Sequence, residues 1–222
     1  MNKNISFIKL DFATIKPYKR SLYFYVLIML LVGFTSKSFN VIFSMIIAGF
    51  PIILSYPFAI SEKNGLDTLY STLSLDRKDV VIGRYSFVVF IKLIAMALLT
   101  IFASVNFNWN SNSLTIGEAS LYISLLFLIL SLLISFQYPL FFKYGYTKAK
   151  IYTYIPLFIL FFCLGILPSI LMKLGVYINW NKLSIILDNN KTSFSILFIL
   201  IGFVFLLISC LISIKIYQKK DI

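Results

Sequence analysis

The sequence predicts an all-α membrane protein: six transmembrane helices, an N-terminal interfacial helix and a short cytoplasmic helix between the second and third spans. Two observations carry this prediction. Of the 222 residues, 60% are hydrophobic and only 13% are charged, and the apolar residues gather in six long runs. A helix needs roughly 20 apolar residues to cross hydrocarbon, where the backbone must satisfy its own hydrogen bonds. We therefore expect one transmembrane domain over residues 1–222.

The segment before the first run repeats apolar residues at helical spacing. These residues are Ile5, Ile8, Phe12 and Ile15. Such a stripe predicts an interfacial helix over residues 5–16, lying in the membrane surface with its apolar side in the lipid. Pro17 ends this helix and lets the chain turn into the membrane. The alternative is a frayed basic tail.

The six apolar runs give the expected spans in chain order. They cover about 21–36, 39–60, 84–105, 119–142, 151–172 and 193–216. The first run is the shortest, and Thr35 and Ser36 extend it. Because consecutive spans alternate in direction, both chain ends and the second and fourth connections are expected on one side of the membrane.

Most of the 20 Lys and Arg residues lie on that side. The exceptions are Lys37, Lys173, Lys182 and Lys191 on the opposite face, and Lys92 within a span. Since Lys and Arg concentrate in short cytoplasmic loops, both termini are expected to be cytoplasmic. The richness in Ile, Lys, Asn, Phe and Tyr is typical of an AT-rich bacterial genome, so we expect a bacterial cell membrane. The net charge of +12 then indicates anionic lipid partners and no nucleic acid.

Residue types that common catalytic sites require are missing. The chain has no histidine, which removes the usual general base and metal ligand. Cys163 and Cys210 fall inside spans and are expected to be packing residues. There is no phosphate-binding GxxxxGK(S/T) loop and no GxSxG turn, and Glu118 and Asp188 fall in external loops. We expect no catalytic, cofactor-binding or metal site in this chain.

Two polar residues inside the spans are candidates for a translocation path. Lys92 lies about two turns into the third span, where a cation either lines a path or extends its amine back to the cytoplasmic surface. Gln137 lies in the fourth span and either lines a path or makes an ordinary interhelical hydrogen bond.

The connection over residues 61–83 is the longest one on the cytoplasmic side. One apolar helical face is formed by Leu66, Leu69, Tyr70 and Leu73. Asn64 is expected to cap this helix, and Asp76, with Asp79 three residues later, to cap the next one. A short amphipathic helix of mixed charge suits a groove on a soluble partner. The alternative is a solvated loop that only joins two spans.

This connection resembles the loop that marks the small ABC-2-type permeases of bacterial ABC exporters. In that family an acidic E-K-N-like start leads to a pattern like L-P-V/I-S/T-R-x-x-V/I-V-x-G/A-K/R-Y/F. The first part is matched by Glu62, Lys63, Asn64, Gly65 and Asp67, and the second by Leu73, Leu75, Arg77, Val80, Val81, Gly83, Arg84 and Tyr85. Ser74 replaces the usual Pro, and Asp76 replaces the usual Ser or Thr. With the six-span layout, the resemblance covers the whole chain.

The resemblance implies a permease subunit that pairs with a second copy or a sister permease and recruits a separate ATPase subunit. ATP and Mg²⁺ would bind that ATPase and not this chain. The connection over 61–83 would be the coupling element, with the contact residues Glu62, Lys63, Asn64, Asp67, Leu69, Tyr70, Leu73, Asp76, Arg77 and Asp79. The expected function is ATP-driven export of a hydrophobic or amphipathic substrate, such as a peptide. The alternatives are a membrane immunity or scaffold protein that moves nothing, and a secondary carrier.

Overall fold

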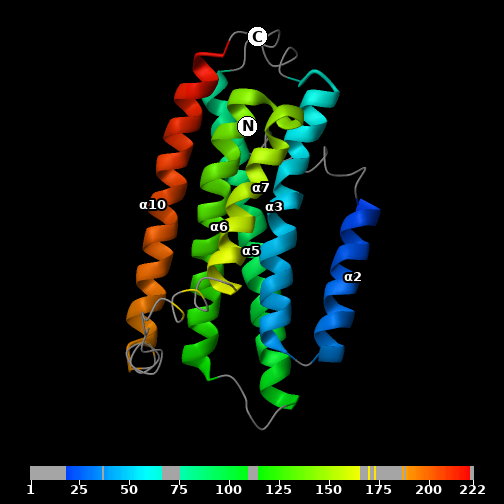
Figure 1. Ribbon diagram of the computed structural model, residues 1–222, viewed down its shortest axis with the longest axis vertical. Helices are drawn as coiled ribbons and strands as arrows, with labels where there is room; N and C mark the ends of the chain where they lie inside the picture. The colour runs from blue at the N-terminus through cyan, green and yellow to red at the C-terminus, as the bar shows by residue number, and fades with distance from the viewer. Residues whose placement is uncertain are drawn as a thin grey trace, which may run out of the picture.

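The computed structural model describes residues 19–36, 38–66, 76–109, 115–165 and 189–220, together with 170, 173 and 187. This part of the chain is helical and contains no strand, which confirms the all-α prediction. Its elements are α2 (Lys19–Ser36), α3 (Phe39–Lys63), α5 (Arg77–Trp109), α6 (Ile116–Tyr144), α7 (Tyr146–Gly165) and α10 (Lys191–Gln218). They stand side by side in one bundle (Figure 1). The predicted interfacial helix over 5–16 lies outside the described residues.

Each apolar run overlaps a helix among the described residues, and most helices extend past at least one end of their run. For example, α5 begins at Arg77, directly after the predicted cap at Asp76, and so starts before the span expected from 84. Four of the described helices are long and apolar enough to cross a membrane: α3, α5, α6 and α10. A shorter apolar helix, Tyr23–Ser36, lies within α2. The six-span count stays a prediction, since the expected end of the fifth span near 172 falls mostly outside the described residues.

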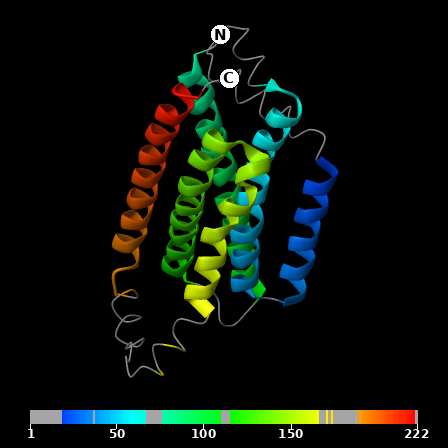
Figure 2. The ribbon, with the colours of Figure 1, turned by 45° about the horizontal axis from the view of Figure 1, so that its top comes forward.

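Successive helices alternate in direction, as Figures 1 and 2 show. One end of the bundle therefore gathers the starts of α2, α5 and α7 and the ends of α3, α6 and α10. We call it the basic end, because it carries Lys63, Arg77, Lys148 and Lys220 among other cations. The distal end gathers the remaining termini, including the starts of α6 and α10.

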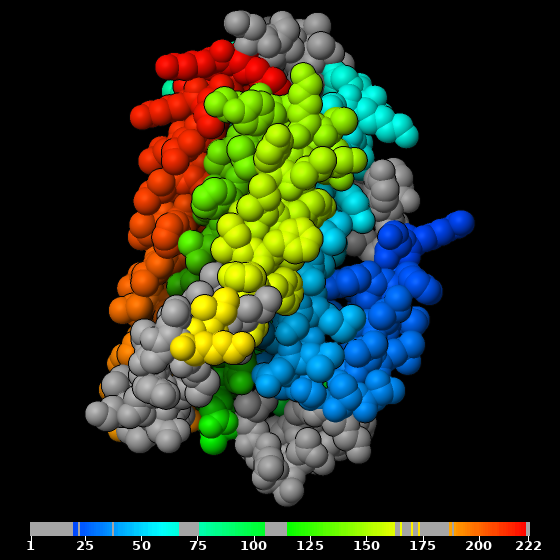
Figure 3. Space-filling model, in the orientation of Figure 1, coloured from blue at the N-terminus to red at the C-terminus, as the bar shows by residue number. Residues whose placement is uncertain are grey.

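Helix α6 is the centre of the bundle and packs against α3, α5, α7 and α10. Its side chains Leu130, Ile134 and Tyr138 are fully buried. In the space-filling view, α7 lies across the visible face between α10 and α3 (Figure 3). On the opposite flank α2 packs chiefly against α3 and leaves apolar side chains such as Leu27 and Leu31 exposed. Exposed apolar side chains of this kind are expected where lipid is the solvent.

The closest helix pair is α6 with α10, which run parallel. The residues that α10 buries are mostly small: Ser195, Gly202, Leu206, Ser209, Ser213 and Tyr217. A Cβ atom at Gly202 would lie 2.9 Å from the ring of Phe127 and 3.0 Å from Ser131 Oγ. Small residues let two backbones approach closely in a membrane, so this stripe accounts for the pairing.

Candidate functional site

The basic end is the strongest candidate site, because several helix termini meet there around a cavity of about 290 Å³. The end of α3 and the start of α5 line it, together with the turn between α6 and α7 and the end of α10. The predicted coupling connection leaves α3 and enters α5 beside this cavity. Two of the residues assigned to coupling, Glu62 and Arg77, have defined partners here.

Glu62 caps a helix that is distant in sequence. Its carboxylate Oε2 accepts hydrogen bonds from the backbone N–H groups of Tyr146 at 2.5 Å and Thr147 at 3.0 Å. These two N–H groups belong to the first turn of α7 and have no acceptor within their own helix. The helix dipole also favours a negative charge at this position. Gly145, with φ of 78°, turns the chain from α6 into α7. A Cβ atom at that glycine would lie 2.9 Å from Glu62 Oε2, so a larger residue would displace the carboxylate.

Arg77 makes the complementary contact, with the C-terminal end of α10. Its Nη1 donates to the backbone carbonyl oxygens of Tyr217 at 3.3 Å, Gln218 at 2.9 Å and Lys220 at 2.7 Å. These carbonyls close α10, where a positive charge is favoured by the helix dipole. Glu62 and Arg77, at the two sides of the coupling connection where it leaves α3 and enters α5, thus hold the start of α7 and the end of α10.

The remaining predicted coupling residues divide into three groups. Lys63 and Asn64 are exposed, and Asn64 is the C-cap of α3, with its backbone N–H bonded to Ile60 O at 3.0 Å. Asp76 directly precedes α5 and its carbonyl accepts from the backbone of Asp79 at 2.9 Å, so α5 starts where the sequence predicted a cap. The third group lies outside the described residues: Asp67, Leu69, Tyr70 and Leu73.

Lys92 is completely buried inside the bundle. Its Nζ donates a hydrogen bond to Ser131 Oγ on α6 and lies 3.5 Å from the centroid of the Phe127 ring. The amine therefore points into the contact between α5 and α6. It does not extend back to the cytoplasmic surface, which was one of the two alternatives expected from the sequence. The hydroxyl and the ring face supply the polar contacts that a buried ammonium requires.

A row of hydroxyl groups continues from Lys92 along α6 and α10. Ser135 Oγ on α6 donates to Phe205 O on α10 at 3.1 Å, and Ser209 Oγ donates back to Ser135 O at 3.1 Å. The Tyr85 hydroxyl of α5 lies 2.6 Å from Ser209 Oγ and 2.9 Å from Ser213 Oγ. Sequence reasoning missed this row, although serines or glycine at positions 195, 202 and 209 mark one face of α10.

The family model described as "ABC-2 family transporter protein" matches residues 6–218. The chain belongs to this family. The match confirms the resemblance inferred from the connection over 61–83 and makes the protein a membrane transport subunit that is not itself catalytic. ABC-2 permeases typically work with an ABC ATPase. Comparison with curated proteins and with solved structures gave no match.

Gln137 contributes no hydrogen bond to this permease's hydroxyl row within the described residues. Its side chain is 1% exposed, and Oε1 has no hydrogen-bond partner in the described part of the chain. The ordinary interhelical hydrogen bond expected from the sequence is therefore not made by this oxygen there. Nor does the described part of the permease contain a cluster of three His, Cys, Asp or Glu side chains that would hold a metal ion.

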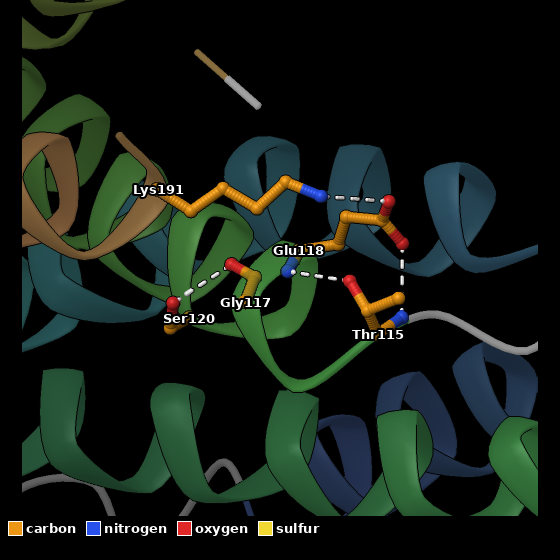
Figure 4. Close-up of polar contacts among 5 residues, drawn as sticks. All are labelled: Thr115, Gly117, Glu118, Ser120 and Lys191. Atoms are coloured by element: carbon orange, nitrogen blue, oxygen red, sulfur yellow. Dashed lines mark hydrogen bonds and ion pairs between the residues drawn. The ribbon is translucent and has the colours of Figure 1, made fainter. Parts of the chain in front are cut away.

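The distal end of the permease has its own polar cluster, at the parallel starts of α6 and α10 (Figure 4). Glu118 lies in the first turn of α6, which corrects its predicted place in a loop. It forms a capping box with Thr115: Thr115 N–H donates to Glu118 Oε2 at 2.9 Å, and Glu118 N–H donates to Thr115 Oγ1 at 3.3 Å. Glu118 Oε1 also pairs with Lys191 Nζ at 3.1 Å, which ties α6 to α10.

Proposed function

We propose that this permease is the transmembrane subunit of an ATP-driven bacterial exporter, acting on a hydrophobic or amphipathic substrate such as a peptide. A separate ATPase subunit would bind ATP–Mg²⁺ and contact the connection over 61–83. The observation that supports this most is the pair of contacts made by Glu62 and Arg77. They lie where the connection leaves α3 and where it enters α5, and each holds the terminus of a different helix.

These contacts suggest how a push on the connection reaches the membrane. Displacement at its first end pulls on Glu62 and so on the start of α7, and displacement at its second end pulls on Arg77 and the end of α10. Helix α10 is in turn bound to α6 and α5 through the serine row. Packed elements with two arrangements convert small local shifts into rigid-body motion, which is what alternating access requires.

The proposal assigns the basic end to the cytoplasm and places Lys92 beside the translocation path. In this scheme separation of α5 from α6 exposes the Lys92 amine to the substrate. Two permeases and two ATPase subunits would form the complex, because the family mechanism sandwiches nucleotide between two ATPases and so needs two coupling connections.

Reconstitution with an ABC ATPase that co-purifies with this permease tests the proposal. We would measure ATP hydrolysis and peptide export in vesicles for Glu62→Gln and Arg77→Gln. The matched controls are Lys78→Gln and Lys150→Gln, which remove exposed charges at the same end of the bundle from residues not assigned to coupling. We expect the first pair to hydrolyse ATP with strongly reduced export and the controls to keep both activities. Normal export in both test variants would defeat this coupling scheme, and a permease that binds the ATPase without any export would favour a scaffold.

A further inference from the structure

The cavity at the basic end has a cationic rim. Its cationic lining side chains are the exposed Lys148, the half-buried Lys220 and the buried Arg84, and Glu62 is the single carboxylate among its lining residues. That carboxylate already accepts two hydrogen bonds from the start of α7. Because cations outnumber the carboxylate and the carboxylate is engaged, the cavity favours an anionic occupant.

The inner wall of the cavity is buried and aromatic. Phe58, Phe141 and Phe142 form it, all less than a tenth exposed. The Arg84 side chain is 3% exposed, and its guanidinium carbon lies 4.6 Å from the centroid of the Phe58 ring. An apolar wall beneath a cationic rim is the arrangement that an amphiphile with an anionic head requires.

Ser61 supplies a second, independent pointer to a ligand. It is 5% exposed and lines the cavity, yet its Oγ has no hydrogen-bond partner among the described residues. Buried hydroxyl groups are nearly always hydrogen-bonded, so this one calls for a partner beyond the described residues. A phosphate oxygen in the cavity would accept a hydrogen bond from this hydroxyl.

We propose that this cavity binds the phosphate headgroup of an anionic phospholipid. The cavity lies where the apolar stretches of α3, α6 and α10 end, which is the depth of lipid headgroups. Its volume of about 290 Å³ is near the lower end of the range of ligand pockets, so it admits a headgroup and not a whole lipid. Basic pockets between transmembrane helices on the cytoplasmic side bind such headgroups. Because Glu62, Tyr217 and Lys220 all line the cavity, bound lipid would link the end of α3 to the end of α10.

Native mass spectrometry of the purified permease in detergent tests the site. The probes are phosphatidylglycerol, phosphatidylcholine and inorganic phosphate. The test variant is the double substitution Lys148→Gln and Lys220→Gln. The matched control is Lys150→Gln and Lys219→Gln, which removes the same charge from exposed neighbours that do not line the cavity. We expect the test variant to bind phosphatidylglycerol about tenfold more weakly and the control to bind as the wild type does.

Ser61→Ala gives a readout that a purely structural role would not. Without lipid, removal of an unpartnered buried hydroxyl should leave the melting temperature in detergent unchanged or raise it. With phosphatidylglycerol, the lipid-dependent rise in melting temperature should shrink. Equal weakening in both double variants, equal binding of phosphatidylcholine, or an unchanged lipid response in Ser61→Ala would overturn the proposal. Binding of inorganic phosphate as tightly as the lipid would assign the site to a soluble phosphate instead.

Discussion

The two ends of the bundle fix their helix termini by different means. At the distal end, α6 is capped from within its own first turn by Thr115 and Glu118, and one ion pair to Lys191 adds the neighbouring helix. At the basic end, α7 and α10 are capped by charged side chains from other helices, Glu62 on α3 and Arg77 on α5. The distal cluster thus serves mainly one helix, whereas the basic cluster links four helices in two pairs, α3 with α7 and α5 with α10.

This difference bears on function. A helix terminus that is capped by its own residues can stay folded while an adjacent helix moves. A terminus held by another helix must follow that helix or lose its cap. Under the proposed function the basic end would transmit displacement, whereas at the distal end α6 would keep its own cap if α10 moved. Substitutions at the two ends should differ in how much stability they remove and in how many helices they affect.

The largest effect is expected from Arg77→Ala. The substitution removes a charged donor from three carbonyl groups at the end of α10, and hydrogen bonds to charged groups are worth about 2 kcal/mol. We expect a lower midpoint of thermal unfolding in detergent and faster hydrogen–deuterium exchange over residues 214–218. Lys78→Ala is the control, since Lys78 is exposed on the same turn. Undisturbed exchange at the end of α10 would contradict the role assigned to Arg77.

A smaller effect, about 1 kcal/mol, is expected from Glu62→Ala, which is the usual loss when a helix N-cap is removed. The amides of Tyr146 and Thr147 lose their acceptor and should exchange faster with solvent. The change should appear on α7, far along the chain from the substitution, while the start of α6 keeps its protection. Lys63→Ala should leave α7 unaltered. If α7 is equally protected in Glu62→Ala, the contrast between the two ends is lost.

The positions of the helices could be predicted from the sequence because long apolar runs mark them, although several helix ends lie beyond the runs. Residue 39 was expected to begin the second span, and α3 starts at Phe39. The capping contacts at the basic end could not be predicted, since Glu62 and Tyr146 are 84 residues apart and Arg77 and Tyr217 are 140 apart. Such pairs meet only after the helices are arranged in space.

The capping box at the distal end could have been predicted from the sequence. Thr115 and Glu118 are three residues apart before an apolar run, which is the sequence signature of a capping box. The direction of the Lys92 side chain could not be predicted from the neighbouring sequence. The rotation of α5 about its axis decides whether the amine contacts Ser131 or the membrane surface.

The smallest effect is expected from Lys191→Met, which removes the ion pair with Glu118 but keeps an unbranched stem beside Gly117. The two side chains are 19% and 37% exposed, so solvent screens the pair and about 0.5 kcal/mol is the expected loss. Because Glu118 keeps its capping box, exchange at the first turn of α6 should change little.

Raising the salt concentration should lower the wild-type melting temperature towards that of the variant, since exposed pairs weaken with ionic strength. Thr115→Ala is the matched comparison: it leaves the ion pair in place and removes part of the cap, so it should loosen α6 with little dependence on salt. A loss of several kcal/mol in Lys191→Met would mean that the distal end, like the basic end, makes its helices depend on one another.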